Sequence, residues 1–360
     1  MFGQQQQQQQ PKANPNNDFE LPQPPSDGVS CLKFSPPNVG NFIIAGSWDQ
    51  KIRCWELNVT KPPQGSTNIA PVINGVIPKA MTSHDAQILC CDWSGDGQKV
   101  FTGGCDGKAK CWNLATNQML QVGQHNEPIK ELFWIEDKQV LVTGSWDKTI
   151  KYWDLRQPNP ALNVDLSERI YAMDCNSPLL VAATADKKIV VYDLNNPSRE
   201  YMKKDSPLPK FQARSLACFP DHTGYALGTI EGRVAIEYFD GPQENKFTFK
   251  CHRENDTTAY SVNCIQFAAP YGTFATAGSD GVNNFWDKDN RNRLKQFAKC
   301  PQTISAAAFN SDATLYAYST SYDWSKGHQF YDPSATNYIF VHPVMVDEIK
   351  KNGSRPGKKR

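Results

Sequence analysis

The apolar and polar positions of this 360-residue chain follow one pattern that repeats seven times. Each copy has an apolar run, a cluster of small residues, an acidic turn, and an alternating segment that ends in an aromatic residue. Alternation with a period of two predicts β-strands, and the small and acidic residues between them predict tight turns. The acid and the closing aromatic residue of the seven copies are Asp49 and Trp55, Asp106 and Trp112, Asp147 and Trp153, Asp186 and Tyr192, Glu231 and Tyr238, Asp280 and Trp286, and Asp323 and Tyr331.

The spacing within and between these copies predicts the architecture. The closing aromatic residue lies six positions after the acid in five copies, and successive closing aromatics follow at intervals of 39 to 57 positions. A period of about 40 to 45 residues is typical of four-stranded propeller blades. The chain is therefore predicted to be all-β and to form a seven-bladed WD-repeat β-propeller.

Two copies carry a further set of polar residues that explains the recurring acid. A histidine before the first strand, a threonine in the second, the turn aspartate and the closing tryptophan can form a buried hydrogen-bonded chain, because a buried imidazole and carboxylate each need a partner. We expect a structural role for these acids and not a catalytic one, since they recur with no nucleophile attached. The other copies lack the full set, and the pair Cys251-His252 is expected to precede the first strand of one repeat. The two sets are His84, Thr102, Asp106 and Trp112, and His125, Thr143, Asp147 and Trp153.

The domain organisation follows from the extent of the repeats. The propeller is predicted to span residues 18–345, with 1–17 as a disordered glutamine-rich arm and 346–360 as a basic disordered tail. The segment 60–80 is rich in proline, glycine and asparagine, and is expected to be a long surface loop. Closure of the ring needs a strand from one terminus, and the alternating segments 18–21 and 338–341 are both candidates.

Composition and motifs exclude several classes of protein. With 38 basic and 37 acidic residues the net charge is only +1, so any contact with nucleic acid must come from a local patch. The 11 cysteines include no C-x-x-C pair and the six histidines form no metal-spaced cluster, which predicts reduced thiols, no metal and no cofactor. The sequence has no phosphate-binding glycine motif, nucleophile elbow, signal peptide or long apolar stretch. We therefore expect a soluble intracellular protein that is not an enzyme.

Two surfaces are candidates for binding. Trp48, Trp146 and Trp324 lie beside turn acids, in loops that gather at one end of a propeller, where they serve either as anchors for a peptide or as packing against the next blade. Between the fifth and sixth blades, aromatic and basic residues alternate, which suits stacking together with phosphate or carboxylate contacts, although an ordinary solvated rim has the same composition. The residues of this expected groove are Arg233, Phe249, Lys250, Trp286, Lys288 and Arg291.

Five further stretches of the sequence are distinctive: 27–36, 144–153, 230–236, 249–253 and 321–328. They resemble the WD-repeat nuclear mRNA export factors that dock on the nuclear pore complex. A sister family, the spindle-checkpoint WD-repeat proteins, shares 27–36, 230–236 and 249–253. The segments 322–331 and 101–112 favour the export factors.

This resemblance implies a function, partners and a location. The family binds a segment called GLEBS of an FG-repeat nucleoporin, links messenger ribonucleoprotein to the pore, and is associated with the mitotic spindle. It implies a nuclear protein at the nuclear envelope and pore complex that shuttles to the cytoplasm, monomeric as a propeller within a heteromeric complex. It also implies that the groove between blades five and six contacts RNA or an acidic mimic of it. The alternative is a checkpoint or kinetochore scaffold that binds a kinase segment, and a substrate-recognition propeller of a ubiquitin ligase is a further one.

Overall fold

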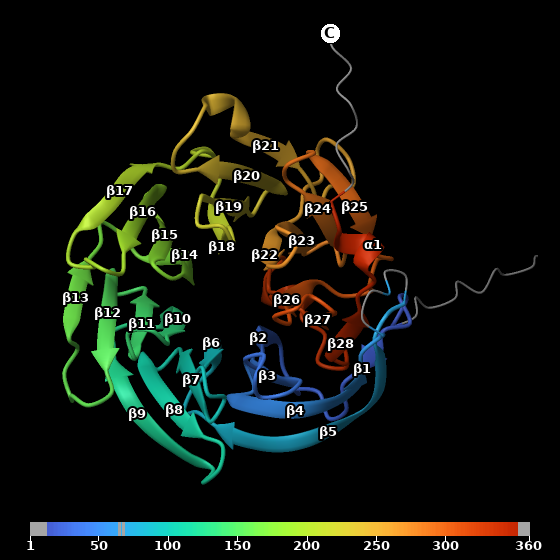
Figure 1. Cartoon of the computed structure of the whole chain (residues 1–360), viewed down its shortest axis with the longest axis horizontal. Helices are drawn as coiled ribbons and strands as arrows, with labels where there is room; N and C mark the ends of the chain where they lie inside the picture. Colours follow the sequence, from blue (N-terminus) through green and yellow to red (C-terminus); the bar gives the residue numbers. More distant parts are fainter. Residues whose placement is uncertain (1–12, 64–65, 67–68, 352–360) are drawn as a thin grey trace, which may run out of the picture.

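The computed structural model describes residues 13–63, 66 and 69–351. Seven four-stranded antiparallel sheets stand side by side in a ring, each with its first strand nearest the centre (Figure 1). The prediction of an all-β, seven-bladed propeller is confirmed. Blades one to seven are numbered here along the chain.

The strands follow one another from the centre of the ring to its rim. Blades one to three consist of β2 (Val29–Phe34), β3 (Phe42–Ser47), β4 (Lys51–Thr60) and β5 (Val72–Ser83); β6 (Ile88–Trp93), β7 (Lys99–Gly104), β8 (Lys108–Asn113) and β9 (Gln118–Gln124); and β10 (Ile129–Ile135), β11 (Val140–Ser145), β12 (Thr149–Asp154) and β13 (Leu162–Asp165). Blades four and five consist of β14 (Ile170–Asn176), β15 (Leu179–Thr184), β16 (Lys188–Asp193) and β17 (Glu200–Asp205); and β18 (Ala213–Cys218), β19 (Gly224–Thr229), β20 (Arg233–Tyr238) and β21 (Phe247–Lys250). Blade six has β22 (Val262–Ala268), β23 (Thr273–Gly278), β24 (Asn283–Asp287) and β25 (Asn292–Gln296), and blade seven has β26 (Ile304–Phe309), β27 (Leu315–Thr320), β28 (Tyr338–Pro343) and β1 (Phe19–Glu20). Three short helices complete the fold: η1 (Gln243–Asn245), η2 (His328–Phe330) and α1 (Val346–Ile349).

The hydrophobic core lies between neighbouring blades, because each sheet buries both of its faces. Val142 and Ile150 of blade three, for example, belong to one buried cluster with Leu180 and Val190 of blade four. Similar clusters follow around the ring, so each blade is stabilised by the two blades that flank it.

Both terminal segments take part in closing the ring. In blade seven, β28 is the third strand and β1 the fourth, with Phe19 opposite Val341 and Glu20 opposite Phe340. The prediction that Tyr331 ends the third strand of this blade is therefore wrong. Tyr331 lies after η2 in the long connection between β27 and β28 and is 39% exposed.

The closing aromatic predicted for blade five is also one position off. In blade three the closing Trp153 pairs with Leu141, the second residue of β11. In blade five the second residue of β19, Tyr225, pairs with Glu237. Glu237 therefore occupies the closing position, and Tyr238 follows it. Local alternation could not resolve this, since both residues sit at the end of the same strand.

The segments predicted to lie outside the ring are partly ordered. Of the expected tail 346–360, residues 346–349 form α1, whose Ile349 is buried and accepts a hydrogen bond through its carbonyl from Thr273 Oγ1 at 2.7 Å. Of the expected arm 1–17, residues 13–17 are described, and Asn16 Nδ2 donates to Ala298 O at 3.2 Å. Residues 1–12 and 352–360 lie outside the described part of the chain.

The expected loop 60–80 is also shorter than predicted. β4 ends only at Thr60 and β5 begins at Val72, so about half of the segment belongs to a long hairpin. The hairpin forms because Val59, Ile73 and Val76 pack on the core between blades one and seven.

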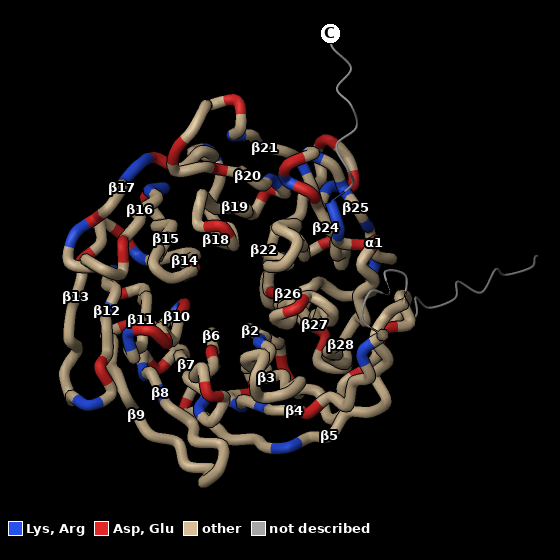
Figure 2. Tube along the Cα trace, viewed as in Figure 1, with Lys and Arg blue, Asp and Glu red and all other residues tan. Residues whose placement is uncertain are grey.

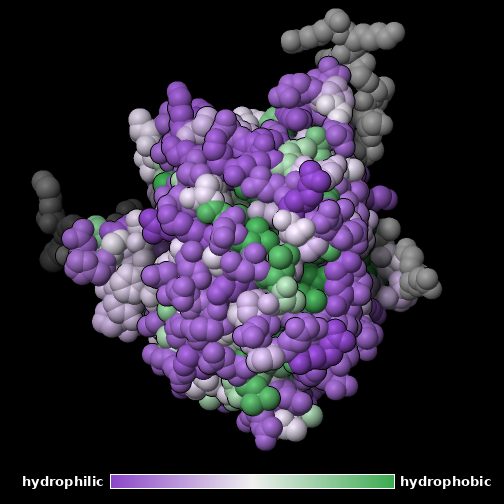
Figure 3. Space-filling model, turned by 90° about the vertical axis from the view of Figure 1, so that its left-hand side faces the viewer, coloured by the Kyte–Doolittle hydropathy of each residue, from purple (hydrophilic) through white to green (hydrophobic). Residues whose placement is uncertain are grey.

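Lys and Arg positions and Asp and Glu positions both occur all around the ring (Figure 2). On the side where β13 and β17 lie, the surface is mostly hydrophilic and is crossed by a narrow hydrophobic stripe (Figure 3). None of the helices in the described residues is long and apolar enough to cross a membrane.

Candidate interaction surfaces

Blade three contains a complete hydrogen-bonded chain that fixes the loop end of the propeller. Trp153 Nε1 donates to Thr143 Oγ1 at 2.8 Å, Thr143 Oγ1 lies 2.7 Å from His125 Nε2, and His125 Nδ1 lies 2.9 Å from Asp147 Oδ2. Burial lowers the pKa of His125, against the opposing effect of Asp147. A neutral imidazole that accepts at Nε2 and donates at Nδ1 satisfies every member of this chain.

Blade two does not form the chain that the sequence predicted. His84 Nε2 lies 2.5 Å from Thr102 Oγ1, but its Nδ1 is 3.9 Å from Asp106 Oδ2. Trp112 Nε1 donates instead to Asn117 Oδ1 at 2.9 Å. Burial, reinforced by nearby Lys110, lowers the pKa of His84 to about 4. The equal His-to-Trp spacing in blades two and three therefore predicted the positions but not the contacts.

Blade six contains a complete chain that the sequence analysis missed. His252 Nδ1 lies 2.9 Å from Asp280 Oδ1, and Thr276 Oγ1 lies 2.8 Å from His252 Nε2 and accepts from Trp286 Nε1 at 2.9 Å. The interval from His252 to Trp286 exceeds that of blades two and three because the chain makes a detour at 253–259, closed by a bridge between Arg253 and Ala259. A search that allowed for such an insertion would have found it.

The loop end of the propeller carries an exposed aromatic cluster where blades seven and one meet. Trp324 stacks on Tyr331 with ring centroids 5.1 Å apart, and lies 5.6 Å from Tyr322 and 6.3 Å from Trp48. Trp48 and Trp324 are each 37% exposed. We refer to Trp48, Tyr322, Trp324 and Tyr331 as the aromatic platform.

The third predicted anchor, Trp146, lies apart from this platform. It is 37% exposed and follows β11 in blade three, two blades away from Trp48. The three tryptophans therefore share one end of the propeller but do not form one cluster. The two tyrosines of the platform were not predicted: Tyr331 was expected to close a strand, and Tyr322 was not considered as an anchor.

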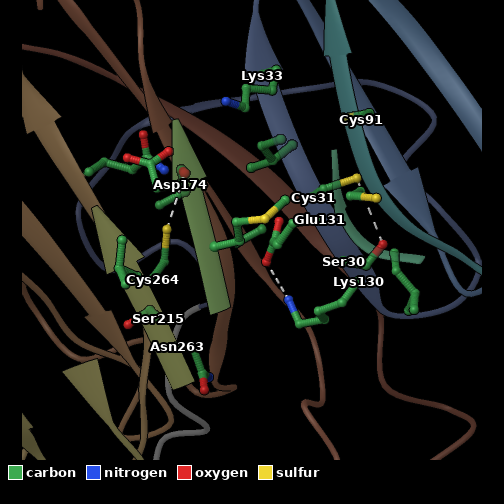
Figure 4. Close-up of a pocket in the computed structure, with 18 of the residues that line it drawn as sticks. Ser30, Cys31, Lys33, Cys91, Lys130, Glu131, Asp174, Ser215, Asn263 and Cys264 are labelled. Carbon is green, nitrogen blue, oxygen red and sulfur yellow. Dashed lines mark hydrogen bonds and ion pairs between the residues drawn. The ribbon is translucent and has the colours of Figure 1, made fainter. Parts of the chain in front are cut away.

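The mouth of the central cavity adjoins the aromatic platform. Every first strand has a bulge after its first residue, and these strands all begin at the end where the loops of Trp48 and Trp324 lie. Most of the bulged residues, together with neighbours such as Glu131 and Cys264, line the cavity in Figure 4. The bulged residues are Ser30, Leu89, Lys130, Tyr171, Arg214, Asn263 and Ser305.

Two of these residues are cations with different surroundings. Lys130 Nζ is 2.5 Å from Glu131 Oε1, so its charge is neutralised. Arg214 donates through Nε to Asn263 Oδ1 at 3.3 Å, and no carboxylate among the described residues is within ion-pair distance of it. The mouth thus offers one guanidinium that is free to meet an anion.

On the rim between blades five and six, the structure brings three of the six predicted groove residues together. The rings of Phe249 and Trp286 are 4.8 Å apart. Phe247 extends this stack, and the Arg291 guanidinium lies 4.6 Å above its ring. Arg293, which the sequence analysis did not single out, lies 5.9 Å from the Trp286 ring. Phe247, Phe249, Trp286, Arg291 and Arg293 form what we call the aromatic-basic rim.

The other three predicted groove residues lie elsewhere, which corrects the expected groove. Arg233 pairs with Lys250 across β20 and β21, on the opposite sheet face from Phe249, and stacks over Phe211 at 5.0 Å. Lys288 is only 6% exposed, and its Nζ lies 2.8 Å from Asp289 Oδ1. Alternation along a strand separates neighbouring positions, so closeness in sequence did not place these cations on one surface.

Within the described residues, no group of three or more His, Cys, Asp or Glu side chains is arranged to hold a metal ion. All 11 cysteines are free thiols. Burial raises the pKa of Cys90 and Cys91 well above the usual value, so these are unreactive thiols.

Comparisons with known proteins agree with the fold. The sequence model of the family described as WD domain, G-beta repeat, matches residues 19–56, 75–113, 117–154 and 243–287. The ring of seven sheets, with the hydrogen-bonded chains in blades three and six, defines a WD-repeat β-propeller.

The similarity to whole proteins is more specific. The chain is 47% identical to the mRNA export factor of Xenopus tropicalis, with 95% of this chain and 93% of the relative covered. It is 43% identical to Protein Rae1 of Drosophila melanogaster (94% and 96%) and 44% identical to the Poly(A)+ RNA export protein of Schizosaccharomyces pombe (95% and 94%). The chain therefore belongs to the mRNA export factor family, whose WD40 propeller is a non-enzymatic kind of protein.

Proposed function

We propose that this protein is an adaptor in nuclear mRNA export that binds a GLEBS segment of an FG-repeat nucleoporin at the nuclear pore complex and contacts RNA. Membership of the mRNA export factor family supports the role in mRNA export and a place in nucleocytoplasmic traffic. The peptide and RNA contacts rest on the two surfaces described above.

The single observation that carries peptide binding is the aromatic platform. The ring centroid of Trp324 lies 5.1 to 6.3 Å from those of the other three platform residues, and all four side chains remain partly exposed. Exposed, clustered tryptophan and tyrosine side chains lose little conformational entropy on binding and often dominate the affinity of an interface.

The charge at the cavity mouth indicates which kind of peptide would fit. Arg214 lies at the same end of the ring as the platform and has no carboxylate partner among the described residues. A peptide that crosses the platform toward the centre would gain a charge-assisted hydrogen bond by placing an acidic side chain there. The proposed segment is therefore acidic near its middle and apolar where it meets the platform.

The RNA contact is assigned to the aromatic-basic rim. Stacked aromatic rings with guanidinium groups above them suit unpaired bases and phosphates, without sequence preference. The net charge of +1 makes this contact local and weak.

Titration of a labelled GLEBS-type nucleoporin peptide into the full chain, followed by fluorescence anisotropy, tests the proposal. We expect selective binding of this peptide over a checkpoint-kinase peptide. Trp324→Ala should weaken the affinity at least tenfold, since it removes the centre of the platform. Arg214→Gln should weaken it less and should reduce the salt dependence.

Tyr201→Ala is the matched control, because Tyr201 is 58% exposed on the outer strand of blade four, away from the platform. It should leave the affinity unchanged. Trp146→Ala measures whether the peptide extends to blade three. Tighter binding of the kinase peptide would assign the protein to the checkpoint scaffolds instead, and equal effects of Trp324→Ala and Tyr201→Ala would exclude the platform.

A further inference from the structure

Blade seven joins the two ends of the ring, and only the pairing of its outermost strand is short. Its outermost strand, β1, contains two residues, Phe19 and Glu20, whereas every other blade is built from consecutive strands of the chain. Beyond these two pairs, Leu21 N donates to Ile339 O at 2.9 Å. So short a ladder adds little stability by itself, and other contacts must hold the N-terminal segment in place.

His342 occupies a special position in this joint. His342 pairs with Tyr316, the second residue of β27. The equivalent pair in blade three is Trp153 with Leu141, the second residue of β11. An ionisable residue therefore stands where blade three has its closing tryptophan. Its Nδ1 lies 2.7 Å from Asp18 Oδ1, just before β1, and its Nε2 lies 2.9 Å from Glu348 Oε2 in α1. An imidazole that faces carboxylates with both nitrogens can satisfy both only as the doubly protonated cation.

The other groups around His342 come from β27, from β25 and from the residues that follow β25. Tyr318 of β27 donates its hydroxyl hydrogen to Asp18 Oδ2 at 2.6 Å. Lys295 of β25 forms an ion pair with Glu348 and lies 3.2 Å from His342 Nε2. The Phe297 ring packs edge-on against the imidazole at 4.9 Å. The Cys300 thiol is buried and lies 4.0 Å from Asn16 Nδ2.

The arrangement is largely closed to water. The side chains of Asp18, Glu348 and His342 are 2%, 9% and 12% exposed. Loss of one proton from the imidazole would leave one of its two carboxylate partners without that donor. Asp18 would then retain only Tyr318 as a side-chain donor, or Glu348 only Lys295, and an under-solvated buried carboxylate is costly.

We propose that His342 is a proton-dependent clasp: it holds the N-terminal segment onto blade seven, links it to α1, which packs on blade six, and weakens as the pH rises. The clasp joins the two terminal segments of the described chain through one side chain. Its opening leaves the other six blades paired, because none of them uses a strand from the opposite end of the chain.

The ionisation of the groups agrees with this direction. Burial and the nearby Lys295 ammonium act to lower the pKa of His342, but the hydrogen bonds to Asp18 and Glu348 outweigh them and raise the pKa above its usual value. The folded pKa of His342 then exceeds its unfolded pKa. The clasp therefore stabilises the terminal segments fully below about pH 6.5, and this stabilisation is lost as the pH rises through the folded pKa. Burial acts to raise the pKa of Glu348, but its bonds to His342 and Lys295 lower it, so this carboxylate stays ionised throughout that range.

Hydrogen exchange of the full chain between pH 6 and pH 9, followed by mass spectrometry and expressed as protection factors, tests the clasp. We expect protection of residues 18–21 and 346–349 to fall with rising pH, by at most tenfold per pH unit for one proton. Protection of β15 and β16 in blade four should stay constant and serves as the internal reference.

His342→Gln should remove this pH dependence, since glutamine keeps hydrogen-bonding groups but cannot be protonated. His328→Gln is the matched control, because His328 is exposed in the loop after β27. If His342→Gln does not fold, Glu348→Gln provides the second arm and should move the midpoint to lower pH. Constant protection in the wild type, or an unchanged pH profile in both variants, would overturn the proposal.

Discussion

His252 and Asp280 are joined by a hydrogen bond of 2.9 Å, although the sequence pattern placed no such chain in blade six. The same bond links His125 and Asp147 in blade three, also at 2.9 Å. In blade two the corresponding atoms are 3.9 Å apart. The three blades thus provide a natural comparison of formed and unformed contacts.

Asp280→Asn and Asp147→Asn should each lower the free energy of unfolding by about 1 to 3 kcal/mol, because a buried histidine loses a charged partner. Asp106→Asn should cost less than about 1 kcal/mol, since His84 Nδ1 already lacks this bond. Urea unfolding of the three variants measures these differences. Equal losses at all three positions would show that the distance in blade two does not reflect a missing contact.

Acid should destabilise the protein through His84 and His125, because burial lowers the pKa of both. In the unfolded chain His84 gains a proton near pH 6.5, whereas burial holds its folded pKa at about 4. Because the folded pKa is the lower one, His84 contributes fully to the free energy of unfolding above about pH 6.5. This contribution is lost as the pH falls toward 4, at up to about 1.4 kcal/mol per pH unit. Thermal unfolding over this range should show a shallower slope for His84→Gln, and an identical slope would contradict the assignment.

The two cations of the expected groove should behave differently. Arg291→Ala should weaken binding of single-stranded RNA and reduce its logarithmic salt slope by about one, with unchanged stability, because Arg291 lies on the aromatic-basic rim. Lys288→Met should leave RNA binding unchanged, because Lys288 is buried against Phe219 and Tyr238. Filter binding at several salt concentrations distinguishes the two, and the reverse result would restore the groove as first predicted.

Leu21 anchors the N-terminal segment after β1. Its side chain is fully buried in the core between blades one and seven, so Leu21→Ala should lower the free energy of unfolding by about 2 to 5 kcal/mol. Leu120→Ala, at a position 65% exposed on the rim of blade two, should change it by less than about 0.5 kcal/mol. Chemical denaturation compares the pair, and a small effect at Leu21 would show that β1 is not needed for closure.

The sequence alone determined the architecture, because blade formation is local. The alternating strands, the turn acids and the interval between closing aromatics are all set by neighbours along the chain, and they predicted seven blades. Segments 18–21 and 338–341 were identified as closing candidates for the same reason, and the structure uses both.

Tertiary structure decided which residues meet. An insertion hid the chain at His252, and the long connection after β27 moved Tyr331 from a predicted strand to the aromatic platform. The face on which a side chain lies depends on register, which separated Lys250 from Phe249, and burial depends on the neighbouring blade, which enclosed Lys288. The contact between Asp18 and His342 joins distant parts of the chain, and only closure of the ring brings them together.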